Sequence, residues 1–272
     1  MGQVTPTDRR AALRAGAGLV AGGVFLAACS GRGDTPHGER AAPASPAPTS
    51  PAPPSHAPAR PLTAVPTPRA FPNQPAQIAA GPRTRPQVAL TFHGAGDPAI
   101  AKSLLGEAER AGARVTVLAV GTWLDEQPEM ARRILDGGHD LGNHTRRHLG
   151  INDMTEAEAR AEIAGCAQRL KRLTGGVGNW FRPSRAARAS PLVVRLAREA
   201  GYPHVLSYDV DSLDFTSPGA DRVARTVLAD VRPGSVVSLH FGYRDTVAAL
   251  PVVLEELGRR GLRAVTTTEL LS

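Results

Sequence analysis

The chain has 272 residues, of which 42% are hydrophobic and 21% are charged, so it is long enough to fold around a large apolar core. Its formal net charge is +7, but residues 1–85 hold nine arginines and three acidic residues, which leaves only +1 for the other 187 residues. No basic surface is therefore expected on the folded part, and nucleic-acid binding loses its main support. Only two cysteines, Cys29 and Cys166, are present, and if Cys29 is modified, Cys166 has no partner, which excludes a disulfide framework within one mature chain.

The first 29 residues have the pattern of an export signal. Arg9 and Arg10 precede an apolar run over residues 15–28 that is too short to span a bilayer as a permanent helix. The run ends in Leu26-Ala27-Ala28-Cys29, which resembles the lipobox of bacterial lipoproteins, and the paired arginines resemble a twin-arginine signal. We expect an exported protein, anchored to the outer face of the bacterial cytoplasmic membrane through a lipid on Cys29. The alternative is an ordinary export signal with a chance cysteine.

Residues 30–85 have the composition of a disordered linker. Fifteen of the 24 prolines lie between Pro36 and Pro86, and no apolar periodicity is present there. Such a segment buries too little surface to offset its ordering entropy. As a flexible coil it would span on the order of 40 Å. We expect a tether that lets a single domain over residues 86–272 work in a cell wall.

The residues after the linker alternate between strand and helix patterns. The clearest helix is expected where Thr155 and Glu158 form a capping-box pattern and Gly175 suits the end. This alternation favours an α/β fold with a parallel sheet or barrel, in which functional side chains gather at the C-terminal ends of the strands. The predicted strands cover residues 87–92, 114–120, 205–208, 235–239 and 262–265, and the predicted helices cover 98–111, 128–136, 155–173, 190–200, 220–230 and 246–259.

Polar clusters lie where these predicted strands end. His144 and His148 follow a Gly-Asn pair that suits a turn, and their spacing lets both imidazoles face one divalent metal. Because the ends of parallel strands meet at one rim, we expect the other clusters to lie near this pair. They are Thr91–Asp97, Phe181-Arg182-Pro183, Asp209–Phe215 and Ser238-Leu239-His240.

In order and content these motifs resemble those of the polysaccharide deacetylases, the family that shares the NodB homology domain. The resemblance covers roughly residues 86–268 and implies a distorted (β/α) barrel. It also implies the removal of acetyl groups from N-acetylated sugars with one divalent metal, which we expect to be zinc. The segment His144-Thr145-Arg146-Arg147-His148 matches the second family motif, which implies that His144 and His148 are metal ligands.

Three further motifs imply catalytic roles. Asp211-Ser212-Leu213-Asp214-Phe215 and Leu239-His240 match the fourth and fifth motifs, with phenylalanine in place of the common tryptophan. This implies that His240 is the general acid and that Asp214 orients its imidazole. Arg182-Pro183 matches the third motif, although Ser184 departs from it. Arg182 is therefore expected to orient an acidic partner near the metal.

The first motif departs from the family pattern. The family has Thr-Phe-Asp-Asp-Gly-Pro, whose aspartates are the general base and a metal ligand. Here Thr91-Phe92-His93-Gly94-Ala95-Gly96-Asp97-Pro98 places a histidine at the base position and a glycine at the ligand position. We expect the glycine-containing loop to bring Asp97 back as the third ligand, with His93 as the base. The alternative is that His93 itself is the third ligand.

Taken together, these features predict a metal-dependent hydrolase for the carbon–nitrogen bond of an acetylated wall or extracellular glycan, either peptidoglycan or chitin-like. An amide is a poor electrophile, so a metal, a base and an acid are all needed. The altered first motif leaves two alternatives: a wall-glycan-binding protein with impaired catalysis, and an O-acetyl carbohydrate esterase. No nucleic acid and no obligate protein partner are expected.

Several remaining residues have structural explanations. His139 and His204 lie beside predicted strands and are expected to be structural or to lie at the rim. Trp123 and Trp180 are expected to pack in the core or to form a sugar platform. Tyr243 follows His240 closely enough to contact the substrate. Cys166 lies in a helical pattern and is expected to be a small core residue.

Overall fold

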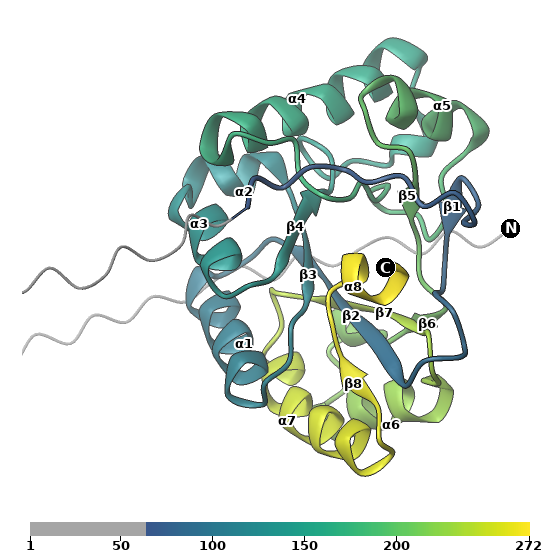
Figure 1. Cartoon of the computed structure of the whole chain (residues 1–272). Coiled ribbons are helices and arrows are strands. Elements are labelled where there is room, and N and C mark those ends of the chain that lie inside the picture. The colour runs from purple at the N-terminus through teal and green to yellow at the C-terminus, as the bar shows by residue number, and fades with distance from the viewer. Residues whose placement is uncertain (1–63) are drawn as a thin grey trace, which may run out of the picture. The chain divides into compact units, whose positions relative to one another are not determined.

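The computed structural model describes residues 64–272; the predicted leader with Cys29 and the first part of the predicted linker lie outside this range. A parallel sheet in the order β4-β3-β2-β7-β6, with β8 paired to β2, forms the centre of the fold (Figure 1). Its strands are β2 (Gln87–Gly94), β3 (Thr116–Ala119), β4 (Asp140–Asn143), β6 (Val210–Asp211), β7 (Val236–His240) and β8 (Arg263–Ala264).

A second, two-stranded sheet completes a distorted barrel. β1 (Gln77–Ile78) pairs in parallel with β5 (Val205–Leu206). Phe181 makes parallel bridges both to Asn143 at the end of β4 and to Val205. The chain then passes from β5 directly to β6, which lies at the other edge of the larger sheet. The two edges are thereby connected, and the predicted distorted (β/α) barrel is confirmed.

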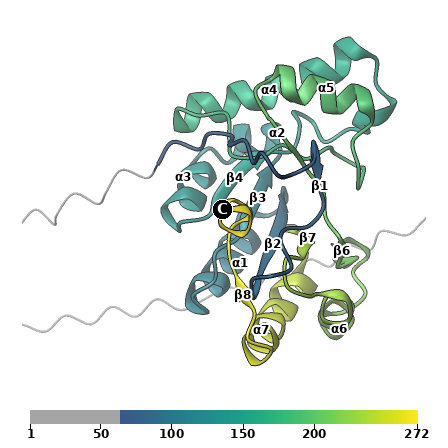
Figure 2. The same cartoon turned by 45° about the vertical axis from the view of Figure 1, so that its right-hand side comes forward.

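Helices surround the sheet on the outside, except for the last one, whose Leu270 and Leu271 pack with Ala89 and Leu118 on the inner face (Figures 1 and 2). α4 begins with the predicted capping box of Thr155 and Glu158 and ends at Gly175, whose φ of 84° is left-handed. None of the helices within residues 64–272 is long and apolar enough to cross a bilayer. The helices are α1 (Pro98–Arg110), α2 (Gly121–Glu126), α3 (Glu129–Asp136), α4 (Glu156–Thr174), α5 (Pro191–Glu199), α6 (Ala220–Asp230), α7 (Arg244–Arg259) and α8 (Thr267–Leu271).

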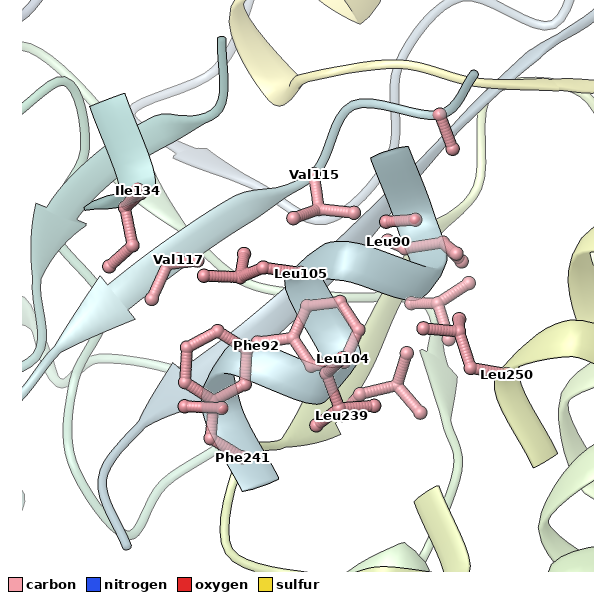
Figure 3. Close-up of a cluster of buried hydrophobic side chains, with 14 of the residues drawn as sticks. Leu90, Phe92, Leu104, Leu105, Val115, Val117, Ile134, Leu239, Phe241 and Leu250 are labelled. Atoms are coloured by element: carbon pink, nitrogen blue, oxygen red, sulfur yellow. The ribbon is translucent and has the colours of Figure 1, made fainter. Parts of the chain in front are cut away.

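The packing of β2 decides where the site lies. Leu90 and Phe92 pack with Leu104 and Leu105 of α1 in the cluster between the sheet and the outer helices (Figure 3). Because successive side chains of a strand point to opposite faces, His93 points away from this cluster, toward the inside of the barrel. Burial of the apolar face of β2 therefore fixes the direction of the His93 imidazole.

The folded part begins earlier than the predicted residue 86. The ring of Phe71 stacks on that of Trp180 with centroids 5.6 Å apart, and Ile78 in β1 is fully buried. Nη2 of Arg83 also lies 2.8 Å from Oδ2 of Asp209. A two-residue strand has no measurable periodicity, and its proline-rich surroundings resemble a linker, so the sequence pattern places this boundary too late.

Candidate metal centre and active site

Three histidines meet at the C-terminal rim of the barrel, where β2 and β4 end on either side of β3. His93 is the penultimate residue of β2, and His144 follows the last residue of β4. One ring nitrogen from each of His93, His144 and His148 lies within 4.8 Å of those of the other two. The ring centroids are 4.3 Å apart for His93 and His144 and 4.8 Å apart for His144 and His148. The structure thus brings the predicted pair together with His93.

The donor set of this three-histidine group fits a divalent metal. Nδ1 of His144 lies 3.1 Å from the carbonyl oxygen of Arg182, which can only accept, so Nδ1 carries the proton and Nε2 keeps its lone pair. Nε2 of His144 and Nε2 of His93 are buried and have no hydrogen-bond partner within residues 64–272. Buried polar atoms normally have a partner, and three imidazole nitrogens at one point are a ligand set of zinc.

The surroundings of the group keep its imidazoles neutral. Burial lowers the pKa of His93 and that of His144 well below the ordinary value of 6.5, and the neighbouring imidazoles lower both further. Burial also lowers the pKa of His148, with Arg185 as the next cause. Neutral imidazoles have the lone pairs that metal binding requires, so the group is ready to bind without first losing protons.

A strained turn presents two of these ligands. Thr145 has a φ of 69° and His148 a φ of 57°, in a region that residues with side chains rarely adopt. The N–H of Thr145 donates to Oδ1 of Asn143 at 2.8 Å, and the N–H of His148 donates to Oγ1 of Thr145 at 3.2 Å. Nδ2 of Asn143 in turn donates to the carbonyl of Ile163 at 2.9 Å. These bonds hold the turn in a conformation that is otherwise unfavourable.

Asp97 is placed at the start of α1. Its Oδ1 accepts from the N–H of Ala99 at 2.8 Å, so it is the N-cap of a helix that has Pro98 in its first turn. Its carboxylate is not in the three-histidine group, where His93 stands instead. The geometry therefore favours the alternative ligand, His93, and gives the expectation of an Asp97 ligand no support, because the carboxylate already caps the helix.

His240 faces His93 from the adjacent strand. The two residues are direct partners in the register of β2 and β7, and their rings meet edge to face with centroids 4.3 Å apart. Nδ1 of His240 lies 2.7 Å from Oδ1 of the fully buried Asp214. Oδ2 of Asp214 accepts from the N–H of His240 at 2.8 Å and from Oγ1 of Thr246 at 2.7 Å. The imidazole is held by its Nδ1, so its Nε2 remains for the substrate.

Arg182 is fully buried beside this group. Its Nε donates to the carbonyl of Leu206 at 3.3 Å and its Nη2 to that of Ser207 at 3.0 Å, while Nη1 has no partner within the described residues. Burial lowers the pKa of Arg182 to about 9. Within residues 64–272 Arg182 donates to no carboxylate, so the expected acidic partner is not found. The position that holds the catalytic aspartate in the family is occupied by His93 here. The positive charge of Arg182 instead contributes to lowering the pKa of His93.

The imidazoles open into a cleft of about 560 Å³. Tyr243 lines it, as expected for a substrate contact, and its ring meets that of His240 at 5.9 Å. Phe215 also lines the cleft and is about half exposed, at 46%. The cleft therefore combines imidazoles with aromatic rings that are suited to a sugar face.

His139, His204, Trp123 and Trp180, for which structural roles were expected, do not line this cleft. Nδ1 of His139 accepts from the N–H of Val115 at 3.1 Å, and Nδ1 of His204 donates to the carbonyl of Pro75 at 2.8 Å. Trp123 donates from its indole to the carbonyl of Gly96 at 2.8 Å, and both tryptophans are buried in the packing. Trp123 and Trp180 are therefore core residues and do not form a sugar platform.

The sequence motifs do not reveal two residues that contribute to the site. Thr246 holds Asp214, but it lies in the first turn of α7, where no pattern distinguishes it from any other helical threonine. Arg185 lines the cleft with a left-handed φ of 53°. The departure from the family pattern at the preceding Ser184 is the signal in the sequence that marks this loop as unusual.

Comparisons with known proteins agree with this geometry. Residues 80–205 match the family model described as polysaccharide deacetylase. A peptidoglycan-N-acetylglucosamine deacetylase of Bacillus cereus is 30% identical over 200 residues, which cover 70% of this chain and 90% of the relative. The chain belongs to the polysaccharide deacetylase family. A chitooligosaccharide deacetylase of Bradyrhizobium is 32% identical over 197 residues, covering 64% of this chain and 85% of the relative.

Solved structures of polysaccharide deacetylases share the fold. A peptidoglycan N-acetylglucosamine deacetylase in complex with an N-oxidanyl-benzamide is 27% identical with a TM-score of 0.68, covering 72% of this chain and 92% of that one. A mutant of a pseudoenzyme from carbohydrate esterase family 4 (CE4), with restored enzymatic activity, is 25% identical with a TM-score of 0.69 and covers 73% and 72% of the two chains. Enzymes and a pseudoenzyme thus occur on the same barrel.

Proposed function

We propose that this chain is an exported, zinc-dependent hydrolase that removes acetyl groups from the N-acetylated sugars of a cell-wall polysaccharide. The observation that carries the proposal is a group of three neutral imidazoles opposite a fourth imidazole, that of His240, whose Nδ1 is bound by a buried carboxylate. A binding protein has no need for an imidazole held in this way. The names of the relatives, which include deacetylases of peptidoglycan and of chitooligosaccharides, support the same class of substrate.

His93, His144 and His148 are the proposed ligands of the metal. The chemistry that a bound zinc ion supplies is Lewis acidity, which polarises an amide carbonyl and acidifies water. Nε2 of His240 lies on the cleft side and hands a proton to the departing amine, while Asp214 holds the ring in position. Among the described residues that line the cleft, this imidazole is the one that a buried carboxylate orients.

With His93 among the ligands, the site has no carboxylate at the family's base position. General acid–base assistance contributes roughly 10²–10⁴-fold to such reactions. Asp211 is the only carboxylate among the described residues that line the cleft, and its Oδ1 accepts from the N–H of Leu213 at 3.1 Å. We therefore expect turnover below that of a family member with both aspartates, carried by the metal and by His240.

The proposed location rests on the sequence. Arg9, Arg10 and the apolar run to Ala28 support export, and Leu26-Ala27-Ala28-Cys29 supports a lipid anchor at the outer face of the cytoplasmic membrane. The proline-rich residues between Cys29 and the folded part supply reach from that membrane to the wall. A labelled fatty acid incorporated by the wild-type chain and not by a Cys29→Ala variant would support this location.

A second candidate function is a wall-glycan-binding protein with impaired catalysis. It is supported by the histidine and glycine at positions 93 and 94 and by the likeness to a structure of a CE4 pseudoenzyme whose activity had to be restored by mutation. Release of acetate separates the two functions. Zinc-loaded protein is incubated with N-acetylated wall glycan and, separately, with acetylated xylan, and acetate is measured against a His240→Asn variant that keeps the ligand set.

If the wild-type protein releases acetate from the wall glycan and His240→Asn releases it about 10²-fold or more slowly, the result supports the deacetylase function. Stoichiometric zinc with no acetate from either polymer supports the binding protein. Acetate from xylan alone would replace the amidase with an O-acetyl esterase, because an ester is the better electrophile and needs less help from an acid.

A further inference from the structure

The cleft beside the metal group has an unpaired positive charge at its rim. Arg185 and Asp211 are the charged residues other than histidine that line it, and Arg185 has neither an ion-pair nor a hydrogen-bond partner in the part of the chain that the structure describes. The guanidinium of Arg182 lies behind the same wall, with Nη1 unpartnered and its Cζ 5.4 Å from the ring of Tyr208, which faces the cleft. One buried and one exposed guanidinium therefore flank the imidazoles.

The loop that contains Arg185 is held firmly in place. Ser184 before it accepts from Oγ1 of Thr145 at 3.0 Å and donates to the carbonyl of Leu149, and the carbonyl of Ala187 accepts from Oγ of Ser207. Between these anchors Arg185 adopts a φ of 53°, which is unfavourable for a residue with a side chain. Backbone strain of this kind at a binding cleft is typical of a functional residue, and the fold specifies the backbone position from which the Arg185 side chain extends into the cleft.

The ligand set adds no negative charge to the site, and Asp211, the one carboxylate among the described residues that line the cleft, accepts from the N–H of Leu213 and forms no ion pair with Arg185 within residues 64–272. Three neutral imidazoles contribute no negative charge, and the carboxylate of Asp214 accepts three hydrogen bonds on the far side of His240. Arg185 is also close enough to His148 to lower its pKa. An anionic group on a substrate whose amide reaches the imidazoles would thus meet Arg185 at the rim, and a guanidinium binds a carboxylate through paired hydrogen bonds.

We propose that the preferred substrate is an N-acetylated sugar that carries a free carboxylate next to its acetamido group, as muramic acid does in a glycan strand from which the stem peptides have been removed, and that Arg185 binds this carboxylate. The inference rests on the proposed deacetylase function and narrows its substrate. In muramic acid the lactyl carboxylate is attached to the ring carbon adjacent to the one that carries the acetamido group. An amide at the imidazoles therefore places the carboxylate near the rim of the same cleft.

The test compares the free acid of an N-acetylmuramic-acid-containing disaccharide with its methyl ester, which has nearly the same shape and no charge. For the wild-type protein loaded with zinc, kcat/KM for acetate release is expected to be at least about fivefold higher for the acid, since Arg185 is exposed and its charge is partly screened. The ratio is expected to approach one in Arg185→Gln and to be partly retained in Arg185→Lys. Arg188→Gln, at a neighbouring exposed arginine that does not line the cleft, should keep the wild-type ratio.

A binding measurement separates this inference from the proposed function. The Kd values of the acid and of the ester are measured by calorimetry on zinc-loaded His240→Gln protein, which avoids turnover. Equal kcat/KM values for acid and ester, or equal Kd values, would overturn the carboxylate inference while acetate release stands. The absence of acetate from every substrate would refute the deacetylase, and a fivefold preference in Kd that disappears in Arg185→Gln would then still support the carboxylate site.

Discussion

The hydroxyl of Thr246 offers a direct probe of how His240 is held. Oδ2 of the fully buried Asp214 accepts from Oγ1 of Thr246 at 2.7 Å, and replacement by valine keeps the shape and removes this donor. A hydrogen bond to a charged group contributes about 1.5–3 kcal/mol. If the loss appears fully in the transition state, kcat falls by roughly 10- to 150-fold. Since Thr246 lies behind Asp214 and away from the cleft lining, KM is expected to change little.

The matched control for Thr246→Val is Thr246→Ser, which keeps the hydroxyl and is expected to retain most of kcat. Both variants are assayed for acetate release with their zinc content measured, so that a loss of metal is not mistaken for a loss of orientation. The melting temperature of the valine variant should also fall, by about 2–4 °C for each kcal/mol lost in a domain of this size. Equal kcat values for the valine and serine variants would refute the reasoning that Thr246 positions Asp214.

Three further predictions concern the fold. Ile78→Ala should lower the free energy of unfolding by about 2–5 kcal/mol, because this fully buried side chain lies in β1. An unchanged denaturation midpoint would show that residues 64–85 belong to the linker and not to the folded domain. Thr155→Ala should cost about 1 kcal/mol through loss of the capping box, with Thr155→Ser as the control that keeps it, and equal melting temperatures would contradict the cap. Burial lowers the pKa of His139, so the unfolded chain binds more protons than the folded one below about pH 6.5. The free energy of unfolding should therefore fall as the pH is lowered from about 6.5, and in metal-free protein this slope should be shallower for His139→Asn; an unchanged slope would mean that His139 titrates alike in both states.

The long elements of the fold could be predicted from the sequence because each has its own signals. α4 has a capping box and a terminal glycine, and α6 coincides with the predicted residues 220–230. The predicted strands do not include β1, β4 or β6. β1 and β6 have two residues each and do not lie in a longer apolar run, unlike the equally short β5 and β8, and β4 contains a Gly-Asn pair that suits a turn. The connection that turns the sheet into a barrel runs through Phe181 and β5, and it depends on contacts far apart in the chain.

The candidate site was predictable in part for similar reasons. His144, His148, Asp214 and His240 lie in motifs with recognisable spacing, and the structure brings them to one rim. The family pattern could not decide between Asp97 and His93 as the third ligand, because both lie within three residues of Gly94, which occupies the position of the family's metal-binding aspartate. The Asp-Pro pair at positions 97 and 98 is itself a signal for the start of a helix, and this local preference for an N-cap decides where the carboxylate goes.

Zinc content tests the central claim most directly. The wild-type protein, His93→Ala and Asp97→Ala are each purified, loaded with a small excess of zinc, dialysed, and analysed for bound metal together with the melting temperature. A centre of three imidazoles predicts about one zinc per chain in the wild type and in Asp97→Ala, a small loss of helix stability in Asp97→Ala, and little bound zinc in His93→Ala. Full zinc occupancy in His93→Ala with loss of zinc in Asp97→Ala would contradict the account and return the ligand role to Asp97.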